Sequence, residues 1–215
     1  MKTPFRTVLS SPLRFLLLGL SLAIIASGAR LACAADATAP VQGVETALKQ
    51  ARPVFENQKL PASRRRRELH AIAKQHFDFP YMARESLGVH WRTLTPAQRA
   101  QYVPLFTDFV IDSFLAILQQ STVHAVSHSL TGTATITSPG YAEVHSLVKL
   151  PSLSQPLKVD YRMHRENAGW KIYDITIDGV SQMASYRNDF NSVINQSGYP
   201  ALVTDLKDKR VPMAH

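Results

Sequence analysis

The hydrophobic period of the sequence changes part-way along the chain, and this change limits the folds that the chain can adopt. Over positions 44–120, apolar residues recur every three or four residues, as in amphipathic helices. Over positions 133–177, they alternate with polar residues, as in strands with one buried face. Helices followed by neighbouring strands predict an α+β fold, with a four- or five-stranded antiparallel sheet that helices cover on one face.

Helix signals divide the first half of the chain into segments that begin near positions 44, 63, 80 and 95. The clearest start is Thr95, which is followed by proline at the first helical position and by Gln98, the pattern of a capping box. Pro104 lies inside this last segment and removes one backbone hydrogen bond, so that it predicts a kink or a division of the helix.

Turn residues separate the predicted strands in the second half. The sequences Ser138-Pro139-Gly140 and Asn167-Ala168-Gly169 each lie between two alternating segments and predict hairpins. We also expect an earlier strand near positions 123–130. After the last strand, Ser181 and Gly198 predict the start and the end of a closing helix.

Strict alternation assigns the faces of the two strands predicted on either side of Asn167-Ala168-Gly169. In the first, Val159, Tyr161 and Met163 share one face. In the second, the same rule puts Ile172 on the face opposite to Ile175. A polar residue such as Asp174 then shares the face of Ile172.

The N-terminal residues have the pattern of a secretory signal peptide at 1–34. Basic residues precede an uncharged apolar run at 15–29, and Ala32-Cys33-Ala34 has the form of a cleavage site. The run is shorter than the ~20 residues of a membrane span. We therefore expect export, a flexible lead at 35–43, a single domain at 44–210 and a short tail at 211–215. Cleavage would leave a chain without cysteine, and thus without a disulfide.

The charge of the chain is positive but moderate. The whole sequence carries a net charge of +8, and loss of the four basic residues of 1–34 would leave about +4. This value favours contact with an anionic membrane surface or an acidic partner, and it lacks the dense basic stripe of a nucleic-acid-binding protein. The run Arg64, Arg65, Arg66 and Arg67 predicts either a solvated helix face or a docking patch for acidic lipid headgroups or a partner protein.

Neither metal-binding nor catalytic patterns stand out. His124 and His128 lie four residues apart on a predicted strand, about 13 Å, which is too far to chelate one ion. The acids Asp78, Asp174 and Asp178 belong to no nucleophile, P-loop or triad motif. We expect no metal site, no cofactor and no catalytic residue. Two alternatives stay open: a small enzyme with a buried general base in a cavity, and a structural adaptor with a filled interior.

A set of short motifs resembles the MlaC family of periplasmic phospholipid-binding proteins, also called the toluene-tolerance family. The motifs cover nearly all of the chain after position 44, and they are specific in combination. They are Leu87-Gly88 before Trp91, Thr-Pro-Ala-Gln-Arg from Thr95, Tyr173-Asp174, Gly179-Val180-Ser181, Tyr186-Arg187 with Phe190, and Gly198 with Leu202 and Leu206.

The resemblance implies a monomeric carrier rather than an enzyme. Members of this family carry phospholipid between an outer-membrane lipoprotein complex and an inner-membrane ABC transporter with an MCE-domain protein. The region of Trp91 also leaves open a branch of the family that accompanies hopanoid biosynthesis. Transferred to this sequence, the resemblance implies a lipid pocket lined by Phe106, Phe109, Val110, Phe114, Val159, Tyr161, Met163, Val180, Met183 and Tyr186.

Overall fold

The chain consists of two compact units, Met1–Asp36 and Ala37–His215. The computed structural model describes residues 21–120, 127–150 and 153–208. In the first unit, the described residues 21–36 are helical and belong to α1 (Ser21–Glu56). No helix within the described ranges combines the length and the hydropathy that a membrane span needs. The signal peptide expected at 1–34 stays a prediction, since positions 1–20 lie outside these ranges.

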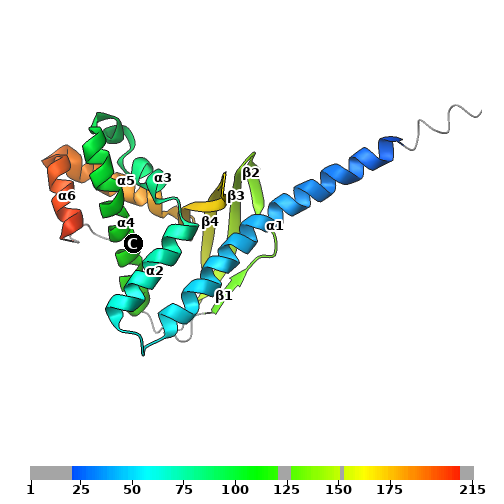
Figure 1. Cartoon of the computed structure of the whole chain (residues 1–215), viewed down its shortest axis with the longest axis horizontal. Helices are drawn as coiled ribbons and strands as arrows, with labels where there is room; N and C mark the ends of the chain where they lie inside the picture. The colour runs from blue at the N-terminus through cyan, green and yellow to red at the C-terminus, as the bar shows by residue number, and fades with distance from the viewer. Residues whose placement is uncertain (1–20, 121–126, 151–152, 209–215) are drawn as a thin grey trace, which may run out of the picture. The chain divides into compact units, whose positions relative to one another are not determined.

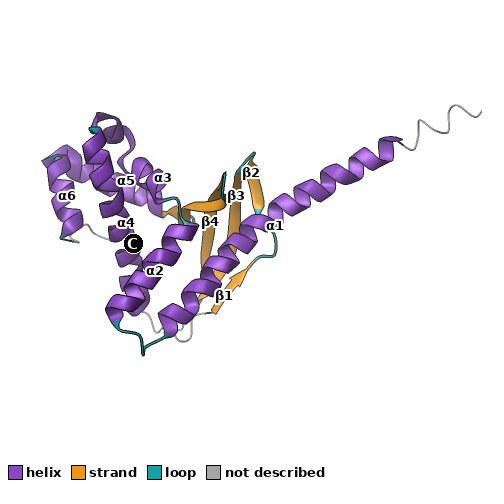
Figure 2. Cartoon of the chain, viewed as in Figure 1, coloured by secondary structure: helices purple, strands orange, loops and turns teal. Residues whose placement is uncertain are grey.

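In the second unit, helices come before the strands of the sheet in sequence and again after them, as Figures 1 and 2 show. The remaining helices before the sheet are α2 (Ala62–His76), α3 (Phe79–Leu87), the 3₁₀ helix η2 (Gly88–Thr93) and α4 (Pro96–Gln120). The strands are β1 (Ser127–Leu130), β2 (Thr135–Ser138), β3 (Tyr141–Lys149), β4 (Leu157–Glu166), β5 (Gly169–Ile177) and β6 (Val180–Ser181). Helices α5 (Gln182–Ser197) and α6 (Tyr199–Lys207) follow.

One antiparallel sheet contains all of the described strands, which confirms the predicted α+β class. Its order is β1-β3-β4-β5-β6, and β2 also pairs with β3. It has six strands rather than four or five, because β6 was not predicted. The backbone reverses at Asp178 and Gly179, which both have positive φ, so that Val180 returns to pair with Ile177.

The predicted assignment of faces in β5 is wrong, because this strand contains a β-bulge. Met163 pairs with Ile172, whereas Arg162 pairs with Asp174, so that Tyr173 is an extra residue in β5. An extra residue shifts the two-residue alternation by one position. Ile172 therefore packs in the same apolar cluster as Ile175, and not opposite to it.

The flexible lead expected at 35–43 is instead part of α1. Val41 and Val44 are buried against the sheet, and the carbonyl of Ala37 accepts a hydrogen bond from the backbone N–H of Ala134 at 3.1 Å. Small and polar residues suggested a loop, but the two valines lie one helical turn apart and bury the same face of α1. Tertiary packing thus overrides the weak local preference.

The predicted helix boundaries of α4 and α5 are confirmed. Thr95 Oγ1 accepts from the N–H of Gln98 at 3.2 Å, and Gln98 Oε1 accepts from the N–H of Thr95 at 2.8 Å. Helix α4 continues through Pro104 as one element. Ser181 Oγ accepts from the N–H of Ala184 at 3.0 Å, and Gly198 ends α5 with φ 81°.

Candidate functional site

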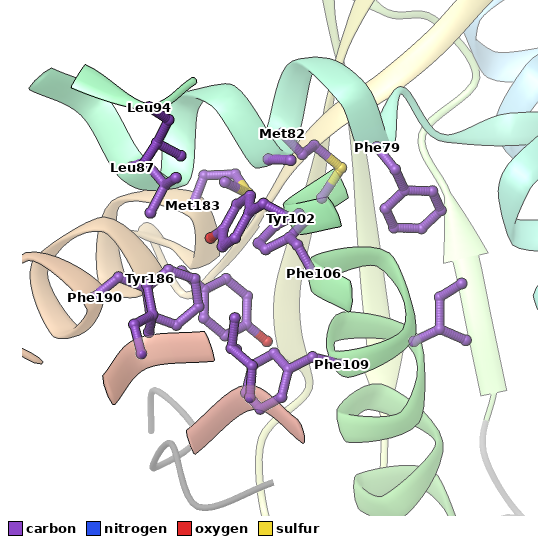
Figure 3. Packing of buried hydrophobic residues seen from close by; sticks show 14 of the residues in the cluster. Phe79, Met82, Leu87, Leu94, Tyr102, Phe106, Phe109, Met183, Tyr186 and Phe190 are labelled. Carbon is purple, nitrogen blue, oxygen red and sulfur yellow. The ribbon is translucent and has the colours of Figure 1, made fainter. Parts of the chain in front are cut away.

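The helices of the second unit enclose an apolar core, which we call the helix cluster. Four residues predicted for the lipid pocket lie in it: Phe106, Phe109, Met183 and Tyr186. In Figure 3 these side chains from α4 and α5 point toward one another, and the rings of Phe109 and Tyr186 are 6.0 Å apart. Burial raises the pKa of Tyr186 to about 12. The other labelled members are Phe79, Met82, Leu87, Leu94, Tyr102 and Phe190.

A second core, the sheet cluster, lies between α1 and the inner face of the sheet. It contains three more of the predicted pocket residues, Val159, Tyr161 and Met163. The hydroxyl of Tyr161 is 2.9 Å from Nε2 of His128 on β1. Burial raises the pKa of Tyr161 to about 12 and lowers the pKa of His128. The other buried members are Val41, Val44, Ala134, Ala142, Val144 and Ile172.

The last three predicted pocket residues lie at the margins of these cores. Val110 is half-buried and packs against the helix cluster. Phe114 on α4 and Val180 at the turn after β5 are each 50% exposed. The structure therefore distributes the ten predicted residues over two clusters and their edges, and does not gather them in one.

Half-buried apolar side chains connect the two clusters. Phe77 packs against both of them. Along α1, Leu48 packs against the sheet cluster, whereas Val54 and Phe55, further along the same helix, pack against the helix cluster. The C-terminal part of α1 thus passes from one core to the other.

A pocket of about 340 Å³ opens between the end of α1, the start of α2 and the second half of α4. Its apolar lining comes from Phe55, Ala62, Leu69, Leu115 and Ala116. Its polar lining comes from Ser63, Arg65, Arg66 and Asp112. None of the ten predicted residues is among them.

The charged groups of this pocket are already partly paired. Arg66 donates from Nε and Nη2 to the two carboxylate oxygens of Asp112, at 2.5 and 2.6 Å, and this hydrogen bonding raises the pKa of Arg66. His70 Nε2 lies 3.0 Å from the same carboxylate. Arg64 pairs with Glu68 within α2. Arg65 lines the pocket and donates a long hydrogen bond of 3.4 Å to the carbonyl of Asn57.

The family model for the MlaC protein matches residues 44–208. The chain belongs to the MlaC family. Among solved structures, it is similar to a phospholipid-binding protein from Ralstonia solanacearum, solved in complex with a phospholipid. The two share 23% sequence identity with a TM-score of 0.69, over 83% of this chain and 100% of the other. At this identity the likeness concerns the fold.

In this MlaC-family chain, Asp174 and Asp178, which were considered as possible general bases, accept hydrogen bonds from backbone N–H groups. Asp174 is buried, accepts hydrogen bonds from Ser181 Oγ at 2.6 Å and from the N–H of Met183 at 3.1 Å, and pairs with Arg162. Asp178 accepts from the N–H of Lys158 at 2.9 Å. Both contacts explain the positions of these acids without invoking chemistry.

Two groups of histidine and carboxylate side chains lie at the polar face of the sheet, opposite to α1. One joins Asp78, His164 and Glu166, and the other joins Glu143, His145 and Asp160. A shared hydrogen bond with Asp78 raises the pKa of Glu166, and burial adds to this rise.

Sequence reasoning missed both the pocket and these two groups. The pocket residues come from α1, α2 and α4, and only the arginine run gave a signal for them. Asp78 and His164 are far apart in the sequence and meet only because the start of α3 packs beside β4 and β5.

Proposed function

We propose that this protein is a lipid carrier that holds acyl chains against the helix cluster, at the pocket beside α2. The observation that carries this proposal is the pocket beside α2, whose lining combines apolar side chains with Arg65 and Arg66. Amphiphiles require this combination, since the tail and the headgroup need opposite surroundings. The volume of the pocket lies near the lower end of ligand sites, so that it accommodates part of a lipid and we propose that loading widens it.

Phospholipid is the cargo that the chemistry supports best. The Ralstonia protein with the same fold binds a phospholipid. In this chain, Arg65 lies at the rim with its charge available to a phosphate group, while Arg66 is held by Asp112. Arginine is well suited to phosphate recognition because its planar guanidinium can donate two parallel hydrogen bonds.

The energetics favour a carrier that exchanges lipid with membranes. Burial of one acyl chain of about 15 methylenes from water gains on the order of 12 kcal/mol, at about 0.8 kcal/mol per methylene. The lipid, however, leaves one apolar surrounding, the bilayer, for another, the pocket, so that the net free energy of transfer is small. Such exchange needs no catalytic group, and we propose that the protein is not an enzyme.

We further propose that the protein works in the periplasm after removal of 1–34. There it would receive and deliver phospholipid at an outer-membrane lipoprotein complex and at an inner-membrane ABC transporter with an MCE-domain protein. The family membership supports this route.

The test is native mass spectrometry of the detergent-free protein, with organic extraction and lipid analysis, on two tryptophan variants. Ala116→Trp places a large side chain in the pocket, whereas Ala100→Trp places the same side chain on an exposed position of the same helix. We expect Ala116→Trp to lose most of the bound phospholipid and Ala100→Trp to keep it. Circular dichroism checks that both variants fold.

Wild-type amounts of lipid in Ala116→Trp would contradict this location of the cargo. A wild-type protein that carries no lipid and takes none from liposomes would contradict the carrier function itself. A stoichiometric hopanoid, from a host that makes one, would assign the protein to the hopanoid-associated branch.

A further inference from the structure

The start of α3 and the end of β4 bring three potential metal ligands together at the polar face of the sheet. Oxygen atoms of Asp78 and Glu166 and a ring nitrogen of His164 all lie within 4.8 Å of one another. This group is outside the pocket described above, and none of its members lines that pocket. The metal-site proposal therefore uses none of the residues invoked for lipid binding.

Asp78 is fixed in place by its own backbone and by one of its two carboxylate oxygens. Its N–H donates to the carbonyl of Ile172 at 2.9 Å, which ties it to β5. Its Oδ1 accepts from the N–H of Tyr81 at 2.9 Å and so caps α3. The second oxygen, Oδ2, points to His164, at 2.9 Å from Nε2.

His164 is buried and held by aromatic rings. It is 9% exposed, and the rings of Tyr81, Tyr173 and Tyr141 lie 4.9, 5.3 and 6.1 Å from its own. Its Nε2 is fully shielded from solvent and makes no well-aligned hydrogen bond within the described part of the chain, although Asp78 Oδ2 is close. A buried ring nitrogen in this position is costly unless it is bonded.

The group of Glu143, His145 and Asp160 differs in the hydrogen bonds of its histidine nitrogens. His145 Nδ1 lies 2.9 Å from Asp160 Oδ1, and its Nε2 lies 3.0 Å from Thr135 Oγ1, both in hydrogen-bond geometry. Both ring nitrogens of His145 are therefore engaged. The group around His145 provides an internal comparison in which no nitrogen lone pair is available to a metal ion.

We propose that Asp78, His164 and Glu166 bind a zinc ion. Two carboxylates and one neutral imidazole balance the charge of Zn²⁺, and this mixture of oxygen and nitrogen donors suits it. With metal–ligand bonds of about 2.1 Å, the separations of 2.9 and 3.9 Å from Nε2 to the two carboxylates correspond to angles of roughly 90° and roughly 135°, on either side of the tetrahedral value. A fourth position stays open to water.

The ion would join the start of α3 to the end of β4. Glu166 is the last residue of β4 and is more exposed than the other two ligands, so that it closes the site from the solvent side. Because Asp78 also caps α3, metal binding would stabilise the junction between the helices and the sheet. Zinc is thus expected to raise the unfolding temperature of the protein.

The experiment is a zinc titration by isothermal calorimetry on the purified protein without a polyhistidine tag, together with thermal unfolding. The variants are Glu166→Gln, which removes a solvent-side ligand at little risk to folding, and Glu143→Gln, the matched change in the His145 group. We expect one tight site in the wild type and in Glu143→Gln, and affinity about tenfold or more weaker in Glu166→Gln. With zinc at about 100 times the dissociation constant, the melting temperature of the wild type should rise by roughly 5–10 °C and fall again with EDTA.

Each other outcome overturns the proposal. Absence of saturable binding by the wild type would show that Asp78, His164 and Glu166 do not hold a zinc ion. Unchanged affinity in Glu166→Gln, or a loss confined to Glu143→Gln, would place zinc elsewhere on the protein. Substitution His164→Gln, measured under the same conditions, must also remove the tight site, and circular dichroism separates loss of the ligand from loss of the fold.

Discussion

At the scale of single residues, Arg187 joins two helices through one side chain. Its Nε donates to the backbone carbonyl of Glu85 at 2.6 Å, and its Nη2 donates to the carboxylate of Glu85 at 3.0 Å. That carbonyl lies in the last turn of α3, where carbonyls lack partners within the helix and where positive charge is favourable. Arg187 thus holds α5 against the end of α3, next to Gly88, whose φ of 52° favours glycine.

Replacement of Arg187 by glutamine should lower the free energy of unfolding by about 1 kcal/mol, because a charge-assisted hydrogen bond to the backbone is lost. The matched control is Arg84→Gln, since Arg84 also contacts Glu85 but only through an exposed pair at 3.4 Å. We expect that control to change stability by less than about 0.5 kcal/mol. Urea unfolding measures both, and equal losses in the two variants would argue against a special role for Arg187.

Among the elements, α4 begins with the capping box that the sequence predicts at Thr95 and Gln98. The reciprocal hydrogen bonds between Thr95 and Gln98 satisfy two backbone donors at the start of the helix. Pro104 does not divide α4, because the helix packs along its length against α3, α5 and α6 in the helix cluster. A proline inside a helix is tolerated when such packing outweighs the lost hydrogen bond.

Substitution Thr95→Ala should therefore destabilise the protein by about 1 kcal/mol, the usual effect of loss of an N-cap side chain. Thr133→Ala is a suitable control, since Thr133 is exposed and lies outside the helices and strands. Chemical unfolding followed by far-ultraviolet circular dichroism reports the difference. If Thr95→Ala matched the control, the capping box would contribute nothing measurable to α4.

At the scale of the whole molecule, each of the two cores contains a buried tyrosine. Tyr161 belongs to the sheet cluster and Tyr186 to the helix cluster, and burial raises the pKa of each to about 12. An unfolded tyrosine titrates near 10. As the pH rises from about 10 to about 12, the unfolded chain loses these protons while the folded chain keeps them, so that stability present below about pH 10 is lost across this window.

Alkaline unfolding should show this loss, with each tyrosine contributing on the order of 2 kcal/mol by about pH 12. Urea unfolding midpoints between about pH 10 and about pH 12 measure the loss of stability, and tyrosinate absorbance in the near ultraviolet follows the titration of the tyrosines. A Tyr161→Phe variant should lose stability less steeply with pH than the wild type. The same pH slope in both proteins would contradict the contribution of Tyr161.

Local spacing and short motifs were enough to predict the fold class, the hairpin turns, the caps of α4 and α5 and the family. Hydrophobic period and capping act over a few residues, and such signals can be recognised before any tertiary contact is known. The ten predicted pocket residues came from the family resemblance, and their role in lipid binding stays a prediction.

Other features depend on distant parts of the chain and arise only in the packed fold. The helix over 35–43 forms because Val41 and Val44 meet the sheet, and the bulge at Tyr173 changes which side of β5 faces α1. The pocket beside α2 and the ligands around His164 likewise combine side chains from separate elements. Contacts of this kind cannot be read from local spacing, because burial and proximity arise only when the whole chain has packed.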